Sequence, residues 1–236
     1  MEKTDAIYED AVKRGKPFTK LSVTRDKIVE ARGWKSALSF IEPNFDSVLT
    51  ELKIFYVPKA LTPGPMFVFP IMDTEGEYNY AQTKPLEGSI YHGKKYYRLG
   101  VEPVGPQWLG NSLVALRNIV KLGRVALVEG PFDLLACRLL VPAAPVLCPL
   151  TKTIGKDHIA YLRMLGIEVT CFLYDNEADL KGYSAGRWQS KDIKEIPMMK
   201  SRVLACPASD PSQALRNYNT ALALKSLLNR LLSSLT

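Results

Sequence analysis

The sequence is poor in the residues that build disulfide scaffolds and zinc sites. Four cysteines and two histidines occur among its 236 residues. The cysteines lie far apart, each inside an apolar stretch, and no CxxC motif or Cys/His pair has the spacing of zinc ligands. We therefore expect four buried thiols and no bound zinc.

Long hydrophobic runs are also missing. No apolar run approaches the ~20 residues of a membrane span, so we expect no membrane partner. The first residues, MEKTDAIYEDAVKRGKPF, mix charges of both signs without an apolar segment, unlike a secretory signal, which predicts a cytoplasmic protein. Contents of 47% hydrophobic and 23% charged residues exclude disordered, collagen-like and coiled-coil proteins. The length predicts one large domain or two closely packed ones, and a net charge of +7 favours an anionic partner.

The pattern of apolar residues changes along the chain. Residues 1–35 predict one or two polar helices, and residues 52–80 alternate apolar runs with Pro and Gly breakers, which is typical of strands and turns. After Leu122, apolar strands alternate with helices, which predicts a parallel sheet flanked by helices. The strands are expected within 124–130, 144–150, 167–175 and 202–205, and the helices within 132–140, 156–165 and about 185–194.

The last segment places four leucines on one face of a predicted helix, namely Leu224, Leu228, Leu231 and Leu235. This face is expected to pack on the protein's own core; the alternative is docking to a partner protein.

Acidic residues stand where the predicted parallel strands end. They are Glu129, Asp133, Asp175, Glu177, Asp179 and Asp210. Any one of them is compatible with solvation or helix capping. The carboxyl ends of parallel strands, however, meet at one edge of a sheet, where unpaired carboxylates repel each other unless a cation neutralises them. Oxygen-only ligands suit Mg²⁺ or Mn²⁺, so the set predicts a divalent metal site.

A second cluster is basic and aromatic. No acid occurs between Glu87 and Glu102, and there His92, Lys94, Lys95 and Arg98 interleave with Tyr91, Tyr96 and Tyr97. The stretch predicts a surface that binds nucleic acid or nucleotide phosphates; the alternative is a solvated loop with tyrosines packed on the core.

Several short motifs, taken in their order and spacing, resemble the catalytic core of DnaG-type bacterial and phage primases, which contains a Toprim domain. VEGPFD resembles the E-G-x-x-D signature and FLYDNEAD the D-x-D/E signature of the Toprim fold. Asp210-Pro211-Ser212 resembles the D-P-D element, MFVFPIMDTEGEYNYAQTKPL a strand pair, and Lys95-Tyr96 part of the basic segment of these primases. The similarity runs from about Thr19 to Tyr218.

The resemblance implies a fold, a reaction and roles for individual residues. It implies a mixed α+β N-terminal subdomain over 1–120, a Toprim domain over 121–212 and C-terminal helices over 213–236. It implies RNA primer synthesis on a single-stranded DNA template from NTPs, in a bacterial or infected host cell. Metal ligands would be Glu129, Asp175, Glu177 and Asp210, the first three catalytic, supported by Asp133 and Asp179. Phosphate or base contacts would come from Lys84, Lys94, Lys95, Tyr96 and Arg98.

The sequence also departs from the primase pattern. Asp179-Leu180 replaces the usual Ala-Gly, Ser212 replaces the last Asp of D-P-D, and Thr151 stands where the family has Gly. No zinc-binding module precedes the resemblance and no P-loop follows it, so we expect either that partners such as a replicative helicase or a zinc-binding subunit supply those activities, or that the protein is a cut-down variant. Two alternatives remain: a Toprim metal-dependent nuclease, and a noncatalytic replication or binding module that keeps the fold.

Overall fold

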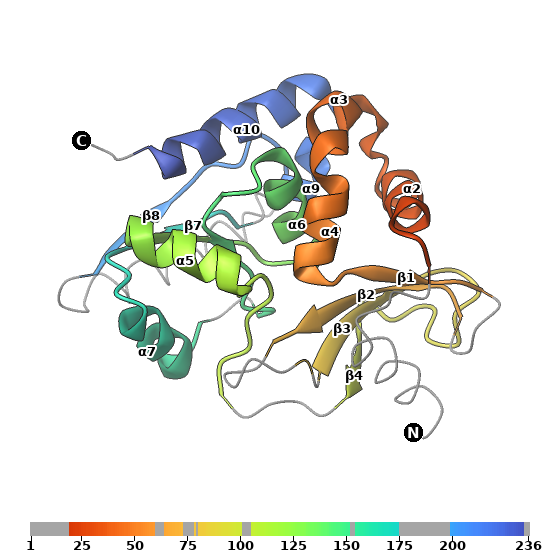
Figure 1. Cartoon of the computed structure of the whole chain (residues 1–236), viewed down its shortest axis with the longest axis horizontal. Coiled ribbons are helices and arrows are strands. Elements are labelled where there is room, and N and C mark those ends of the chain that lie inside the picture. The colour runs from red at the N-terminus through yellow and green to blue at the C-terminus, as the bar shows by residue number, and fades with distance from the viewer. Residues whose placement is uncertain are drawn as a thin grey trace.

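The computed structural model describes residues 19–59, 64–72, 78, 80–100, 105–151, 154–174 and 199–233 (Figure 1). The predicted helix near 185–194 lies outside these residues, as do the predicted site residues Asp175, Glu177 and Asp179. Within the described part of the chain, no helix combines the length and apolar character needed to cross a bilayer.

Short helices and an antiparallel sheet form the N-terminal half. Its helical elements are α2 (Leu21–Arg32), η1 (Trp34–Ala37), α3 (Leu38–Ile41), η2 (Glu42–Asn44) and α4 (Phe45–Leu52). The antiparallel sheet has the order β1 (Phe55–Val57), β2 (Met66–Ile71), β3 (Tyr80–Pro85) and β4 (Tyr97–Gly100). Side chains alternate between the faces of a strand, so half-buried Gln82 and Lys84 share one face of β3 and buried Thr83 points to the other.

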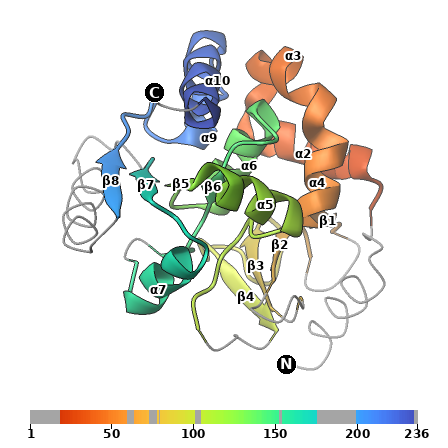
Figure 2. The same ribbon diagram turned by 60° about the vertical axis from the view of Figure 1, so that its left-hand side comes forward.

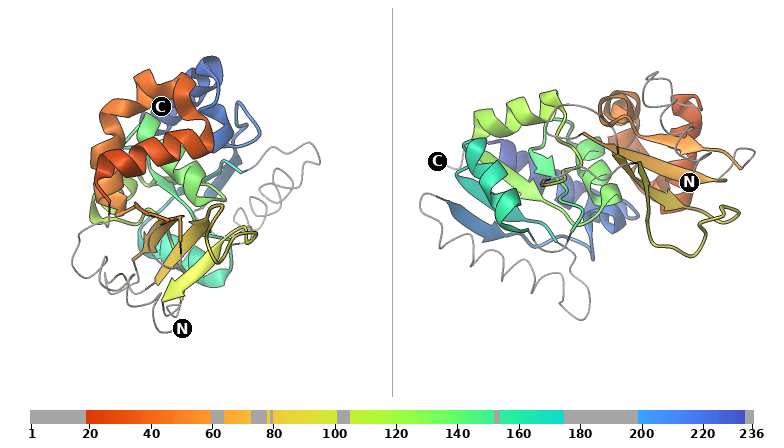
Figure 3. Two further views of the ribbon diagram at one scale, coloured as in Figure 1. Left: turned by 90° about the vertical axis from the view of Figure 1, so that its right-hand side faces the viewer. Right: turned by 90° about the horizontal axis from the view of Figure 1, so that it is seen from below.

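A parallel sheet flanked by helices forms the second half. Its strand order is β6 (Val146–Leu147), β5 (Arg124–Leu127), β7 (Val169–Phe172) and β8 (Lys200–Val203). The helices are α5 (Leu113–Leu122), α6 (Pro131–Leu140), α7 (Lys156–Met164), α9 (Pro211–Ala214) and α10 (Tyr218–Leu232). Figure 2 shows α9 and α10 on one side of this sheet and α7 on the other, and Figure 3 shows the two sheets side by side.

Alternating strand residues build two apolar layers around the parallel sheet. Ala126 and Cys171 face the cluster that contains α6 and α10, whereas Leu127 and Phe172 face the cluster that contains Ile119 of α5. All ten residues of α6 are buried, because this helix lies between the parallel sheet and the N-terminal helices. The larger cluster joins side chains from α2, α4, β2, α6 and α10, so both halves share one core.

The fold predicted from the sequence is confirmed: an antiparallel sheet with helices precedes a parallel sheet flanked by helices. All four cysteines are buried free thiols, as predicted.

The leucine face of α10 packs on the protein's own core, since Leu224, Leu228 and Leu231 are buried there, while Leu235 lies outside the described residues. β8 begins and ends two residues earlier than predicted, and α5 has no counterpart in the sequence prediction.

Candidate active site

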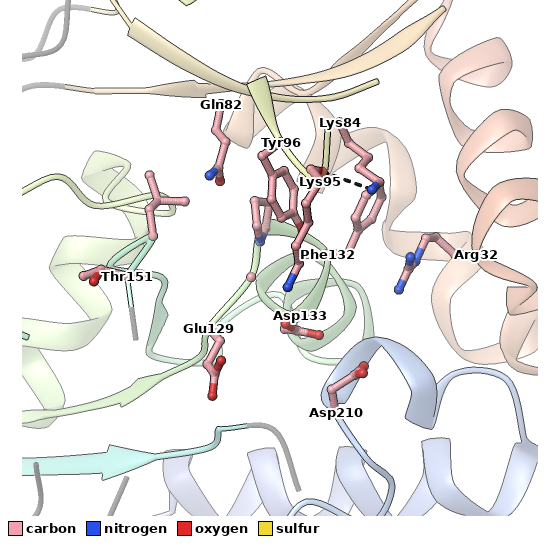
Figure 4. A pocket seen from close by; sticks show the side chains of 13 residues that line it. Arg32, Gln82, Lys84, Lys95, Tyr96, Glu129, Phe132, Asp133, Thr151 and Asp210 are labelled. Carbon is pink, nitrogen blue, oxygen red and sulfur yellow. Dashed lines mark hydrogen bonds between the residues drawn. The ribbon is translucent and has the colours of Figure 1, made fainter. Parts of the chain in front are cut away.

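A cavity of about 300 Å³ lies where the antiparallel sheet meets the carboxyl edge of the parallel sheet (Figure 4). Carboxylates and cations occupy opposite sides of it, and Figure 4 shows the Lys95 side chain extending from the antiparallel sheet toward the acids. The lining residues are Arg32, Gln82, Lys84, Lys95, Tyr96, Glu129, Gly130, Pro131, Phe132, Asp133, Leu150, Thr151 and Asp210.

Three carboxylates form the acidic wall, and backbone amides fix two of them. Glu129 follows β5, and Asp133 lies in the first turn of α6, where its Oδ1 accepts a hydrogen bond from the Ser212 amide at 3.1 Å. Asp210 caps α9, because its Oδ1 accepts from the Gln213 amide at 2.6 Å. Both acids are therefore held in one orientation, and Asp210 Oδ2 also accepts a hydrogen bond from Ser209 Oγ at 3.4 Å.

Gly130 allows the acidic wall and Tyr96 to approach each other closely. A Cβ atom at this position would lie 2.8 Å from Asp133 Oδ2 and 3.6 Å from Tyr96 Oη. The first distance is shorter than any ordinary contact, so a larger residue would displace the Asp133 carboxylate. This close approach explains on steric grounds why the VEGPFD motif has a glycine at position 130.

Arg32, Lys84 and Lys95 form the basic wall. Lys84 Nζ donates a hydrogen bond to the Lys95 carbonyl at 3.0 Å and lies 5.5 Å from the centre of the Tyr96 ring. Burial lowers the pKa of Lys84, and the positive charges of Arg32 and Lys95 lower it further. Cations that repel one another beside a cavity provide a binding site for an anion.

Arg32 is held at the edge of this wall by neutral partners. Its Nε and Nη2 donate hydrogen bonds to Ser212 Oγ at 3.1 and 2.6 Å. The guanidinium also stacks 4.7 Å above the centre of the Phe132 ring. Among the described residues it forms no ion pair, so these contacts fix its position without cancelling its charge.

The loop after β6 supplies a strained residue to the cavity. Leu150 has a φ of 59°, in the left-handed region that residues with a Cβ rarely adopt. It lines the cavity together with Thr151, the position where the primase pattern has Gly. Such backbone strain costs about 1–3 kcal/mol and is concentrated at functional sites.

The structure brings together some of the residues predicted for the site and leaves others outside the cavity. Glu129, Asp133, Asp210, Lys84, Lys95 and Tyr96 all line it. Lys94 instead lies 4.8 Å from the centre of the Tyr97 ring, which stacks on Tyr91 at 3.7 Å. Arg98 is exposed and lies opposite Gln82 in the β3–β4 register. Its side chain is therefore on the same face of the sheet as Gln82, but on β4, one strand farther from the cavity.

The cavity is also lined by residues that are not predicted as site residues from the sequence, namely Arg32, Gln82, Phe132, Leu150 and Thr151. Arg32 carries no local signal, since its contact with Ser212 spans 180 positions of the chain. For Gln82, the two-residue alternation with Lys84 on one strand was an available signal.

The acids that the structure describes do not suffice as a metal site. No three His, Cys, Asp or Glu side chains among the described residues lie close enough together to hold an ion. Glu129 and Asp133 nevertheless offer only oxygen atoms, which are the donors that a hard divalent cation prefers. Strand β7 runs parallel to β5, so both strands end at the same edge of the sheet. In the sequence, Asp175 follows directly after Tyr174, the last described residue after β7.

The fold is that of the RNA polymerase domain of bacterial and phage primases. The RNA polymerase domain of Mycobacterium tuberculosis primase DnaG superposes with a TM-score of 0.59 at 17% identity, over 88% of this chain and 84% of that one. A DnaG primase catalytic domain bound to ssDNA gives a TM-score of 0.63 at 16% identity, over 90% and 73% of the two chains. The primase fragment of the bacteriophage T7 primase-helicase protein gives 0.56 at 14% identity, over 76% and 70%.

At these identities the likeness is one of fold. No protein-family model matches the sequence, and no curated protein matches it significantly.

Proposed function

We propose that this chain is the catalytic core of a DNA-dependent RNA primase, which joins nucleotides on a single-stranded DNA template by metal-dependent nucleotidyl transfer. The observation that carries the proposal is the cavity with two walls of opposite charge. Glu129, Asp133 and Asp210 line one side, and Arg32, Lys84 and Lys95 line the other. A nucleoside triphosphate needs both, because its phosphates require cations and its transfer requires acids that hold a metal.

The acidic wall fits a divalent metal by its donor chemistry. Glu129 and Asp210 would hold Mg²⁺ or Mn²⁺ together with Asp175 and Glu177, with Asp133 and Asp179 in support. When bound, the metal supplies charge stabilisation for the attacking, bridging and leaving oxygens of the transfer. The Asp133 and Asp210 carboxylates are preoriented by the α9 amides, so little reorganisation is needed on binding.

The basic wall would bind and orient the nucleotide. Lys84 and Lys95 both line the cavity and would contact the triphosphate or the template phosphates. Tyr96 would stack on a base, since its ring borders the cavity beside both lysines. Arg98 and Lys94, outside the cavity, would guide the DNA backbone toward it.

The same cavity favours a polymerase over a Toprim nuclease. A nuclease needs the acids but has no need of a triphosphate site, whereas here three cations lie opposite the acids. Incubation of the purified protein with single-stranded DNA, labelled NTPs and Mg²⁺ or Mn²⁺ tests the proposal. Short labelled RNA products on a gel support primase activity, degraded DNA indicates a nuclease, and the absence of either change favours a noncatalytic module.

Replacing Lys95 and Arg98 by alanine is expected to weaken binding of single-stranded DNA and of NTP. Each lost phosphate contact removes about 0.7 from the slope of log affinity against log salt. Fluorescence anisotropy at several salt concentrations measures this slope. The double change Lys53→Ala and Lys121→Ala, which removes two exposed cations outside the cavity, is the matched control. Equal affinity and slope in the parent and the site variant would make the basic segment a solvated loop.

Binding of a nucleotide is expected to be coupled to proton uptake at alkaline pH. The pKa of Lys84 is lowered in the free protein, by burial first and by Arg32 and Lys95 next. A bound polyphosphate favours the charged amine and raises this pKa. Protons are therefore taken up between the free and bound pKa values, and affinity falls as pH rises through the free value. Calorimetry of ATP binding in buffers of different ionisation enthalpy measures the uptake, which Lys84→Arg should abolish.

A further inference from the structure

Ser212 is buried and hydrogen-bonds to two residues that line the cavity, Arg32 and Asp133. It is 1% exposed, and three of its atoms hold three different partners. Its amide donates to Asp133 Oδ1 at 3.1 Å, and its carbonyl accepts from Trp34 Nε1 at 2.8 Å. Its Oγ accepts both hydrogen bonds from Arg32. One residue of α9 thereby joins the acidic wall to a cation from the N-terminal helices.

The guanidinium of Arg32 is held from several directions. The Arg32 carbonyl accepts a hydrogen bond from Arg216 Nε at 3.0 Å, which fixes its backbone. Phe132 supports one face of the guanidinium, and Ser212 engages two of its five N–H donors. Three further N–H donors belong to the guanidinium, and Arg32 lines the cavity.

The chemistry of residue 212 decides whether Arg32 stays an effective cation. A hydroxyl accepts hydrogen bonds without carrying charge, so it orients the guanidinium and leaves its field intact. An aspartate, which the primase pattern has at this position, would form an ion pair with Arg32 and cancel that field within the cavity. It would also place a further carboxylate beside Asp133 and Asp210.

From this geometry we infer that Ser212 is a positioning residue, which presents Arg32 as an unneutralised cation to the phosphates of the bound ligand. The inference rests on the proposed function in one respect, namely that the cavity binds a polyphosphate. It adds to that function that Ser212 determines the balance of charge between the acidic wall and the basic wall.

Asp and Asn at position 212 have the same shape and differ in charge, so this pair of variants separates charge from packing. We measure the affinity for inorganic tripolyphosphate by calorimetry in the absence of divalent metal, so that only the basic wall can attract the ligand. We expect Ser212→Asp to bind about tenfold more weakly than Ser212→Asn, the size of one lost charge-assisted contact. Ser226→Asp on the exposed face of α10 adds the same charge elsewhere and should bind like the parent. Equal affinities for the Asp and Asn variants would overturn the inference.

A measurement without ligand keeps the inference separate from the proposed function. The Nε–H of Arg32 should give a slowly exchanging NMR resonance in the parent, because it donates to a buried oxygen, and should exchange rapidly in Ser212→Ala. Equal exchange in the two proteins would overturn the positioning role even if the parent binds tripolyphosphate. The parent protein could also show a protected resonance and yet bind neither tripolyphosphate nor NTP. That result would show that Ser212 positions Arg32, but it would refute the proposal that Arg32 serves a phosphate ligand.

Discussion

On the proposed function, replacing Glu129 by glutamine is expected to lower primer synthesis by about a hundredfold or more. Mutation of a residue that only supports a metal ligand costs about 10- to 100-fold, so the loss of Glu129, which we propose to be a direct ligand, should cost at least the upper value. Glutamine keeps the size of the side chain and removes one charge from a wall that also holds Asp133 and Asp210. The thermal midpoint should therefore change little, since repulsion within the wall is relieved.

Primer yield on a gel and Mn²⁺ affinity by calorimetry measure the two effects of this change. The control is Glu168→Gln, which alters an exposed glutamate beside β7 at the opposite end of the strand from Asp175. It should keep both activity and metal affinity. Full activity in Glu129→Gln would show that the carboxylate does not take part in the transfer.

Replacing Glu51 by glutamine is expected to destabilise the protein by about 3–5 kcal/mol, the usual cost of breaking a buried ion pair. Arg138 lies fully buried in α6, and its Nη2 donates to both carboxylate oxygens of Glu51 in α4 at 2.7 Å. Ser112, the N-cap of α5, also hydrogen-bonds to Glu51. Burial lowers the pKa of Arg138 and the charge of Glu51 opposes that shift, so without Glu51 the core contains an uncompensated cation.

Urea denaturation followed by circular dichroism measures the loss. The control is Glu42→Gln, because Glu42 is exposed and lies 3.9 Å from Arg25 in a surface ion pair worth at most about 1 kcal/mol. Arg138 Nε and Nη1 find no hydrogen-bond partner among the described residues, so the pair is held by one nitrogen. The double variant Glu51→Leu, Arg138→Met should therefore be more stable than Glu51→Gln alone. A double variant less stable than the single one would contradict this account.

Local patterns in the sequence predict most of the fold. The apolar strands and intervening helices of residues 124–172 are found where the alternation places them, because strands buried on both faces are apolar throughout. The prediction missed helix α5, LVALRNIVKL, although its apolar residues recur at helical spacing and Ala115 and Ile119 are buried one turn apart. Its N-cap Ser112 and C-cap Gly123 were the usable signals.

The candidate site is predicted less completely, and the missing parts are those that depend on long-range contacts. Acids at the ends of parallel strands can be predicted from the sequence to lie close together, because the topology of the sheet brings these strand ends to one edge. The place of Arg32 depends on the packing of α2 against α9, which no local pattern encodes. Lys94 and Lys95 are neighbours in sequence, yet one lies over tyrosine rings and the other lines the cavity, since successive side chains diverge.

The contact between Arg32 and Ser212 also determines when the complete cavity can form during synthesis of the chain. The two residues are 180 positions apart, and Asp133 depends on the same late segment for its hydrogen bond. A ribosome adds about 5–20 residues per second, so the N-terminal helices emerge many seconds before the segment that closes the cavity. Contacts of such high sequence separation form late in folding as well. A nascent or prematurely ended chain that stops before Asp210 thus has Glu129 and the basic wall but lacks the segment that orients Asp133 and Arg32, and the complete cavity first exists when nearly the whole core has been made.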